Sequence, residues 1–172
     1  MRIIKAGPEH AEDLAEIGKN SFWESHGHSA SEEDITAYIV RHFNAEAFRK
    51  DLTEAANLYH IIYHENQMAG YSKMILNQSN ENIVIQPLAK LERLYLTKSF
   101  YGLCIGALLF DYNLELAKKM GQKGMCLAVW KDNHRAIKFY VKQGFKTVGS
   151  YDFKISETHA NPNHIMYLGF QD

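Results

Sequence analysis

The chain has 172 residues, of which 46% are hydrophobic and 23% are charged, so we expect one globular domain over residues 1–172 and not a disordered or fibrous protein. Its 19 basic and 20 acidic residues give a net charge of -1 and form no basic run, which argues against nucleic acid and membrane as partners. The 2 cysteines lack metal-binding spacing, and no segment resembles a signal peptide or a membrane span, so we expect a cytoplasmic monomer or homodimer without a metal.

The first third of the chain is predicted to be mostly helical. Residues 1–6 alternate charged and aliphatic side chains and predict a short strand, which ends at Gly7. A helix then runs to about Phe22, and Ser31 caps a second helix with an acidic first turn. Residues 44–57 predict a third, short helix. The side chains expected to face the core are Ala11, Leu14, Ala15, Gly18, Phe22, Ile35, Tyr38, Ile39, Phe48 and Leu52.

Strands are predicted for the middle of the chain. Residues 58–64 and 68–76 alternate apolar and polar side chains around a tight turn and predict an antiparallel hairpin. We expect a polar loop over residues 77–90 and a strand at "KLERLYLT", residues 90–97. Alternation along that strand places three side chains on one face: Glu92, Leu94 and Leu96.

The second half alternates strands and helices. A helix follows Gly102 and Gly106, the apolar run "GMCLAVW" predicts a central parallel strand, and another helix lies between Asn133 and Gly144. Two strands complete the chain, near residues 146–155 and 163–170. This order predicts an α+β (mixed α/β) domain, in which a strand–turn–helix crossover places its turn where ligands usually bind.

The turn around Gly102 and Gly106 is either a phosphate-binding turn or only the start of a buried helix. Small residues let backbone N–H groups converge on phosphate oxygens at a helix N-terminus. "GALLF" after the glycines excludes the P-loop pattern, and the spacing also excludes the GxGxxG dinucleotide pattern. A diphosphate can still bind the backbone amides between Gly102 and Ala107.

Two segments together resemble a known family. "LERLYLTKSFYGLCIGALLFDYNLELAKKMG" and "CLAVWKDNHRAIKFYVKQGF", over residues 91–145, resemble the core of the GNAT superfamily of acetyl-CoA-dependent N-acetyltransferases. The segment "SFWESHGHSASEEDITAYI", with "LERLYL", is similar to the PaiA-type bacterial spermine/spermidine acetyltransferases. The resemblance implies a central mixed, largely antiparallel sheet flanked by helices, with acetyl-CoA in a cleft where two central strands splay.

One motif of that family is intact and one is altered. The pattern N..A..FY...GF is complete from Asn133 to Phe145. In the pyrophosphate signature, Tyr101 stands at the Arg or Gln position and Cys104 at the first glycine, while Gly106 matches. A side chain at residue 104 costs little if φ is negative but strains a left-handed backbone.

The resemblance also implies a set of cofactor contacts. Backbone groups of one strand bind the pantetheine arm as an added strand, and an N–H there polarises the thioester carbonyl. Asn133 contacts the cofactor, caps its helix, or does both, and Lys142 is either a phosphate contact or a solvated helix lysine. The residues expected at acetyl-CoA are Leu94, Tyr95, Leu96, Tyr101, Gly102, Leu103, Cys104, Ile105, Gly106, Ala107, Asn133, Ala136, Phe139 and Lys142.

Acetyl transfer to an amine needs a base, a polarised carbonyl and a proton for the departing thiolate. An aliphatic amine with a pKa near ~10.4 is mostly charged at neutral pH, so its proton must be removed. Glu92 is the candidate base, and the alternative is a surface carboxylate paired with Lys90 or Arg93. For Tyr140 the resemblance implies a general acid, and the alternative is a core aromatic side chain.

The acceptor is the small-molecule amine that receives the acetyl group. Glu24 and Glu33 lie on the segment that covers the acceptor site in this family and can bind a polycation, although acids at a helix start also stabilise the helix. His26 and His28 are predicted to be loop histidines and not metal ligands. We expect an N-acetyltransferase in which a primary amine of a small molecule, with a polyamine as the first candidate, attacks acetyl-CoA directly in a ternary complex. The alternatives are an acetyltransferase for peptide or protein amines and a non-catalytic CoA-binding sensory module.

Overall fold

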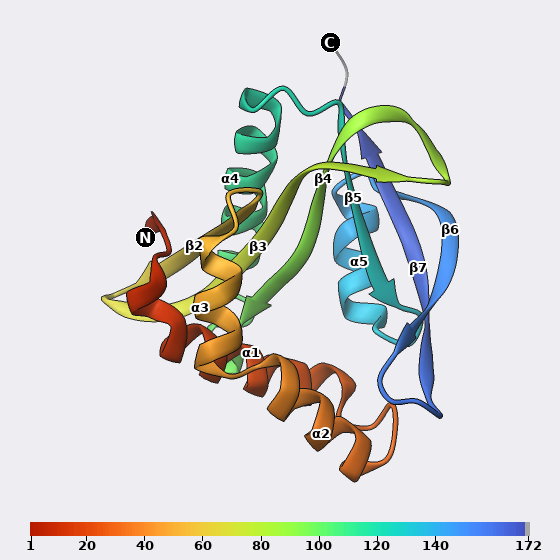
Figure 1. The fold of residues 1–172 in the computed structure, drawn as a ribbon. Coiled ribbons are helices and arrows are strands. Elements are labelled where there is room, and N and C mark those ends of the chain that lie inside the picture. The colour runs from red at the N-terminus through yellow and green to blue at the C-terminus, as the bar shows by residue number, and fades with distance from the viewer. Residues whose placement is uncertain (171–172) are drawn as a thin grey trace.

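The computed structural model describes residues 1–170 and contains one seven-stranded sheet with helices on both faces (Figure 1). The strand order is β1-β2-β3-β4-β5-β7-β6. All neighbouring strands are antiparallel except β4 and β5, which are parallel. The expected α+β class and the mixed, largely antiparallel sheet are therefore confirmed.

The helices and strands have the following bounds. The strands are β1 Arg2–Lys5, β2 Asn57–His64, β3 Gln67–Asn80, β4 Ile83–Leu96, β5 Gly124–Trp130, β6 Lys146–Lys154 and β7 Ala160–Gly169. The α-helices are α1 Ala11–His26, α2 Glu32–His42, α3 Ala45–Thr53, α4 Ile105–Lys119 and α5 His134–Lys142. Two short 3-10 helices are η1 Pro8–His10 and η2 Lys98–Phe100. No helix within residues 1–170 is long and apolar enough to cross a membrane.

The two faces of the sheet carry different helices because successive strand residues point to opposite sides. Tyr59 and Tyr71 pack with α1, α2 and α3, whereas Ile62 packs with α4 and Met74 with α4 and α5. Each large apolar side chain buried in this way contributes about 1.5–3 kcal/mol. The expected core positions are confirmed as buried at Ala11, Leu14, Ala15, Gly18, Phe22, Ile35, Ile39 and Phe48, and as partly buried at Tyr38 and Leu52.

Helix α1 is longer than predicted. It continues four residues past Phe22 to His26, since no glycine or proline interrupts the segment before Gly27. Phe22 and His26, one turn apart, stack with ring centroids 4.5 Å apart, which stabilises this last turn. The prediction that His26 lies in a loop is therefore wrong, while His28 does lie in the following turn.

The polar loop predicted over residues 77–90 is mostly strand. Strand β3 continues to Asn80 and β4 begins at Ile83, with Gln78 opposite Leu88 in the ladder. Backbone hydrogen bonds form this ladder, so exposed polar side chains do not prevent it. The loop is reduced to a turn at residues 81–82.

Strands β4 and β5 diverge after a short parallel pairing, which Figure 1 shows as two arrows that separate. Residues Leu88–Lys90 pair with Gly124–Cys126. In the described part of the chain, the segment of β4 from Leu91 to Leu96 has no β5 partner. A gap in the sheet therefore opens between the carboxyl ends of two central strands.

Candidate active site

The open edge of β4 fits an extended ligand arm. A strand without a neighbour presents unpaired backbone N–H and C=O groups, which an amide-containing chain can complete as an added strand. Leu94, Tyr95 and Leu96 lie on this edge, where the cofactor arm was predicted. The geometry of the sheet therefore fits the pantetheine arm of acetyl-CoA.

The turn before α4 fits a phosphate group. Gly102 and Cys104 have φ angles of 81° and 58°, and both residues are exposed. Helix α4 begins directly afterwards at Ile105, so its first N–H groups have no partner within the helix. The positive φ of Cys104 costs about 1–2 kcal/mol for a residue with a Cβ. Of the two backbone conformations considered for residue 104 from the sequence, Cys104 therefore adopts the left-handed one, which a side chain strains.

Gly106 serves a close approach between helix and strand. A Cβ added there would lie 3.1 Å from Cδ1 of Leu96, so the Leu96 side chain would have to shift by a few tenths of an ångström. Ile105 is fully buried in the core under this turn, and Ala107 is partly buried. Leu103, by contrast, is 50% exposed. The turn is therefore anchored by Ile105 and open at its tip.

Tyr101 joins three elements at this turn. Its ring lies 4.0 Å from Cζ of Arg135 in α5, and Nη2 of Arg135 donates a hydrogen bond of 3.1 Å to its hydroxyl. The hydroxyl in turn donates to Oε2 of Glu24 in α1 over 3.2 Å. Glu24, predicted as an acceptor contact, thus lies beside the phosphate turn. Arg135 was missed, although it stands inside the quoted motif "NHRA".

Helix α5 carries most of the N..A..FY...GF motif to the gap between β4 and β5. Oδ1 of Asn133 accepts a hydrogen bond from the N–H of Ala136 over 3.2 Å, which confirms the predicted cap. Phe139 packs edge-on against Phe110, and Tyr140 against Phe145. Burial, with a smaller contribution from Tyr95, raises the pKa of Tyr140. Its phenol therefore stays protonated at neutral pH.

A bulge in β4 re-aims Glu92. Lys73 pairs with Arg93 and the next residue, Met74, with Leu91, so Glu92 is the extra residue. The carboxylate contacts Lys73 on the α3 side of the sheet, whereas Leu94 and Leu96 pack on the α4 side. The prediction that Glu92 shares their face is wrong because the bulge breaks the alternation.

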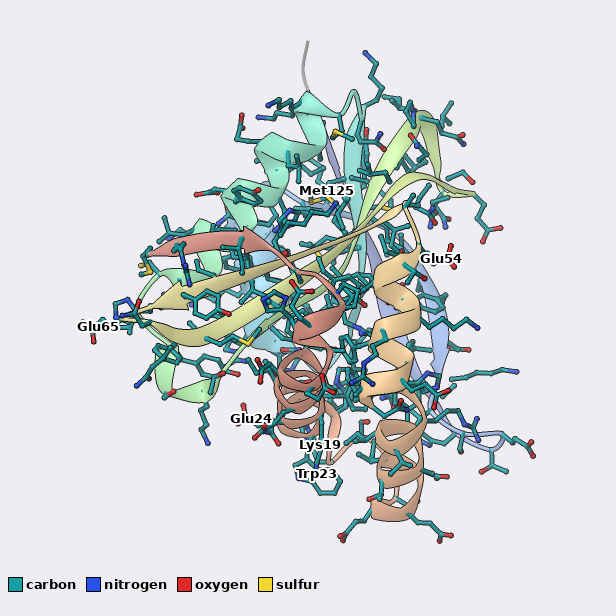
Figure 2. All side chains as sticks on the ribbon, turned by 60° about the vertical axis from the view of Figure 1, so that its left-hand side comes forward. Lys19, Trp23, Glu24, Glu54, Glu65 and Met125 are labelled. Atoms are coloured by element: carbon teal, nitrogen blue, oxygen red, sulfur yellow. The ribbon has the colours of Figure 1, made fainter. Side chains whose placement is uncertain are left out.

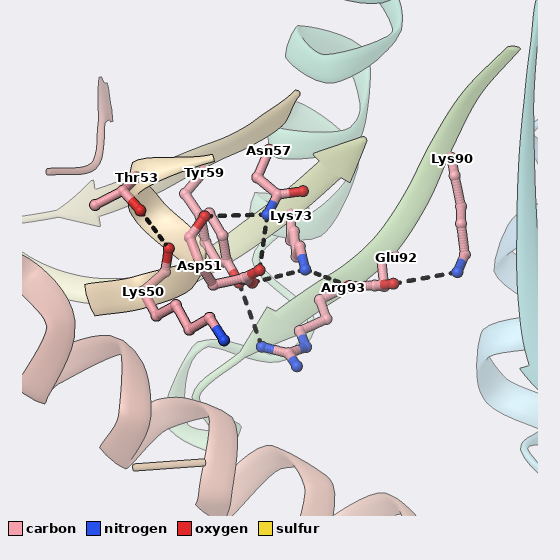
Figure 3. Close-up of polar contacts among 9 residues, drawn as sticks. All are labelled: Lys50, Asp51, Thr53, Asn57, Tyr59, Lys73, Lys90, Glu92 and Arg93. Atoms are coloured by element: carbon pink, nitrogen blue, oxygen red, sulfur yellow. Dashed lines mark hydrogen bonds and ion pairs between the residues drawn. The ribbon is translucent and has the colours of Figure 1, made fainter. Parts of the chain in front are cut away.

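Two lysines hold the carboxylate of Glu92 (Figure 3). Nζ of Lys73 lies 2.6 Å from Oε2, and Nζ of Lys90 lies 3.1 Å from Oε1. Burial alone raises the pKa of Glu92, but Lys73 and Lys90 outweigh it and lower the pKa to about 2. The pairing with Lys90 was one of the two alternatives at the sequence level, and the contact with Lys73 adds a buried partner.

Lys73 is the centre of a buried ionic network that connects α3 to the sheet (Figure 3). Its side chain, 8% exposed, lies 2.6 Å from Oδ2 of Asp51 as well as from Glu92. Asp51 also accepts hydrogen bonds from Asn57 and from the hydroxyl of Tyr59. The sequence feature that could have indicated this network is the single lysine, Lys73, within the otherwise uncharged strand segment "GYSKMIL".

Aromatic and basic side chains surround this network. Arg93 lies over the rings of Phe43 and Phe48, at 4.9 Å and 5.3 Å. It lines a cavity of about 260 Å³ together with Lys73 and side chains of α2 and α3. Burial raises the pKa of Tyr38 and of Tyr151, and the charge of Glu92 adds to both shifts. Both phenols therefore stay protonated at neutral pH.

The end of α1 and the loop that follows it approach the end of β5. His26 and His28 lie 5.5 Å and 5.2 Å from the Trp130 ring, centroid to centroid. Burial, together with His28, lowers the pKa of His26 to about 4, so its imidazole is neutral. Within residues 1–170, no group of three or more His, Cys, Asp or Glu side chains is placed to hold a metal ion.

Two predicted positions do not converge on the gap. Lys142 is the last residue of α5, about 10 Å along the helix from Arg135. Glu33 is exposed in the first turn of α2, away from the turn that Glu24 contacts.

A groove of about 600 Å³ runs along α1 beside the end of β4. Figure 2 shows Lys19, Trp23 and Glu24 projecting from α1, and all three line this groove. The groove contains both acidic and basic side chains, so its charge favours neither a cation nor an anion.

Comparisons with known proteins agree with this geometry. A family model described as "Acetyltransferase (GNAT) family" matches residues 19–145. The chain is 21% identical over 157 residues to an uncharacterized N-acetyltransferase of Lactobacillus delbrueckii, with 91% of each chain covered. It is 28% identical over 149 residues to a spermidine N(1)-acetyltransferase of Thermoplasma acidophilum, covering 85% of this chain and 88% of that protein. The PaiA N-acetyltransferase of T. acidophilum in complex with coenzyme A has a TM-score of 0.78 and 24% identity, with 98% of both chains covered.

Proposed function

Because the chain belongs to the acetyltransferase (GNAT) family and is an acetyl-CoA-dependent N-acetyltransferase, we propose that its acceptor is a primary amine of a small molecule. A polyamine is the first candidate, since the chain is similar over most of its length to a spermidine N(1)-acetyltransferase. The family assignment favours an enzyme over the alternative hypothesis of a non-catalytic CoA-binding sensory module. The two free thiols, Cys104 and Cys126, fit the reducing cytoplasm as the proposed location.

The observation that carries the proposal is the placement of Glu92 and Tyr140 about the gap between β4 and β5. Glu92 lies on β4 two residues after the segment that pairs with β5, on the face covered by α1, α2 and α3. Tyr140 comes from α5 on the other face, in the same apolar cluster as Leu94 of β4. An acid and a base on opposite sides of a gap suit a reaction that both removes and supplies a proton. When bound, acetyl-CoA supplies the acetyl group as a reactive thioester.

We assign two tasks to the β4 edge and Tyr140. Backbone groups of Leu94 to Leu96 bind the cofactor arm, and an N–H there polarises the thioester carbonyl. Tyr140 keeps its proton because its pKa is raised, and it gives that proton to the departing sulfur.

Glu92 is assigned the proton that the amine loses as the new C–N bond forms. An ammonium must first lose one proton to become a nucleophile, and its nitrogen becomes acidic only as it binds the acetyl carbon. A carboxylate with a pKa of about 2 is too weak a base for the first step but can serve the second. The first proton is taken by hydroxide or a buffer base in the solvent, so the fraction of neutral amine increases with pH.

Lys90 can give up its place at the Glu92 carboxylate to the acceptor amine. The side chain of Lys90 is 37% exposed and lies farther from the carboxylate than the buried Lys73 does. The ammonium of the acceptor can therefore replace Lys90 at Oε1 while Lys73 holds Oε2. This exchange would bring an amine to Glu92 without unpaired charge.

Release of the CoA thiol from acetyl-CoA tests the proposal. Purified protein is assayed with spermidine, spermine, simple monoamines, aminoglycosides and a lysine peptide, with acceptor-free reactions as controls. Release stimulated by polyamines would support the proposed acceptor, and release with the peptide alone would replace it by a protein amine. Absence of release with every amine, despite CoA binding by calorimetry, would contradict the proposed acceptor class.

A further inference from the structure

The turn before α4 has the backbone of a phosphate site but no cation of its own. Residues 99–110 contain no lysine or arginine, and Tyr101 stands where the family signature has arginine or glutamine. Backbone N–H groups and the helix dipole attract an anion, but an ionic partner roughly doubles the strength of each hydrogen bond. A cation is therefore expected from another element.

Arg135 of α5 is a cation that the fold brings to this turn. Its guanidinium stacks on the Tyr101 ring at 4.0 Å and donates one hydrogen bond, from Nη2, to the hydroxyl. A guanidinium has five N–H groups in one plane, so several donors remain for a ligand. Stacking fixes that plane, which lowers the entropy lost when phosphate oxygens bind it.

Glu24 holds Tyr101 in the orientation that this requires. The Tyr101 hydroxyl donates to Glu24 over 3.2 Å and accepts from Arg135, so both bonds form together. The row Glu24–Tyr101–Arg135 thus ties α1, the turn and α5 to one another. All three side chains reach the surface, where a charged ligand can approach.

Two other lysines are placed less well. Lys142 lies at the far end of α5, about 10 Å from Arg135 along the helix. Lys98 precedes the turn, but it lines the groove beside α1. Lys98 is nevertheless the closest rival in sequence and belongs in the test.

We infer that Arg135 binds the diphosphate of CoA, with Tyr101 as its positioning residue, and supplies the charge that the altered signature lacks. The inference rests on the use of acetyl-CoA and concerns binding, not acetyl transfer. We assign Arg135 to the diphosphate because its guanidinium lies over the ring of Tyr101 in the turn itself. The alternative is that Arg135 binds the 3′-phosphate of the adenosine, and the ligands of the experiment are chosen to distinguish the two.

Calorimetric titration with three ligands tests the inference without any acceptor amine. The ligands are CoA, 3′-dephospho-CoA and pantetheine, which lacks both kinds of phosphate. Arg135→Ala should weaken binding of CoA and of 3′-dephospho-CoA by about tenfold and leave pantetheine binding unchanged. Raising the salt concentration should weaken CoA binding more in the native protein than in this variant.

Three variants control the experiment. Lys138→Ala removes an exposed positive charge one turn along the same helix and should leave all three affinities unchanged. Lys98→Ala tests the rival lysine. Tyr101→Arg in the Arg135→Ala background restores the signature residue and should recover the tighter binding of CoA.

Each remaining outcome would overturn the inference. A loss confined to CoA, with 3′-dephospho-CoA unaffected, would assign Arg135 to the 3′-phosphate. An equal loss for pantetheine would indicate a structural role, and unchanged binding of all ligands would show that Arg135 makes no contact. A loss in Lys98→Ala but not in Arg135→Ala would transfer the role to Lys98. Because acceptor amines are absent, a wrong assignment of the acceptor cannot produce any of these results.

Discussion

The two ends of the gap between β4 and β5 are built by different means. At the α4 end, a turn with two positive φ angles and the exposed row Glu24–Tyr101–Arg135 presents backbone donors and surface charge. At the β4 bulge, a buried lysine connects two carboxylates from separate elements. Surface contacts adjust ligand affinity at little cost in stability, whereas buried ionic contacts couple chemistry to folding. The two ends should therefore respond differently to substitution.

Removing the buried ammonium should have the largest effect. Lys73→Met leaves Asp51 and Glu92 partly buried without their shared partner, which should lower the free energy of unfolding by about 3–5 kcal/mol. Chemical denaturation measures this change. Lys73→Arg keeps the charge and should recover part of the loss. For an exposed ion pair such as Lys118 and Glu115, we expect a change in the free energy of unfolding below about 1 kcal/mol. A change that small for Lys73→Met would mean that the ion pairs at the bulge contribute no more than surface pairs.

Substitution of the proposed acid should separate chemistry from binding. Tyr140→Phe removes the phenol proton while keeping the ring contacts with Phe139 and Phe145. We expect kcat to fall by about a hundredfold with CoA affinity unchanged. Steady-state rates and calorimetry on the same preparation provide both values. An unaltered kcat would remove Tyr140 from the chemical step.

The pH dependence of stability should carry the signature of Glu92. Its pKa is about 2 in the fold and about 4.3 in an unfolded chain, so the ionised form stabilises the fold above that higher value. This contribution, about 3 kcal/mol, is lost as pH falls from about 5 towards 2. Glu92→Gln lacks it, so the stability difference from the native protein should shrink over that range. Urea midpoints at several pH values measure it, and a constant difference would contradict the ionic network.

Relief of strain at the α4 turn should have the smallest effect. Cys104→Gly removes a Cβ from a left-handed position and should stabilise the fold by about 1 kcal/mol, without weakening CoA binding. Cys104→Ala is the matched variant, because it removes the thiol and keeps the strain. Thermal unfolding compares the two, and equal stability of both variants would show that the turn tolerates a side chain.

The same division explains what could be predicted from the sequence. The α4 turn and α5 lie in one continuous segment, so the spacing from Gly102 to Phe145 sufficed to predict the crossover and the cap at Asn133. Local hydrogen bonds and apolar periodicity determine both features. Ser31 was predicted as a cap for the same reason, and its hydroxyl accepts from the N–H of Asp34.

The bulge end could not be predicted because its partners are distant in sequence. Asp51, Lys73 and Glu92 come from three elements, and they meet only through the register of β3 with β4 and the packing of α3 on the sheet. The bulge that turns Glu92 to the α3 side is itself a register shift, which alternation alone does not indicate. Arg135 was missed for a related reason, since its role depends on the stack with Tyr101 across two elements.

The short pairing between β4 and β5 has a mechanical consequence. Within residues 1–170, the ladder between the sheet halves β1–β4 and β5–β7 joins Leu88–Lys90 to Gly124–Cys126 and is the shortest ladder of the sheet. A co-substrate that hydrogen-bonds to the unpaired backbone groups of β4 would connect the two halves. Because it binds the folded state, the melting temperature should rise with the concentration of the co-substrate. Amide hydrogen exchange along Leu91–Leu96 should slow when CoA is bound and quicken after release. Each catalytic cycle would then close and reopen the sheet itself.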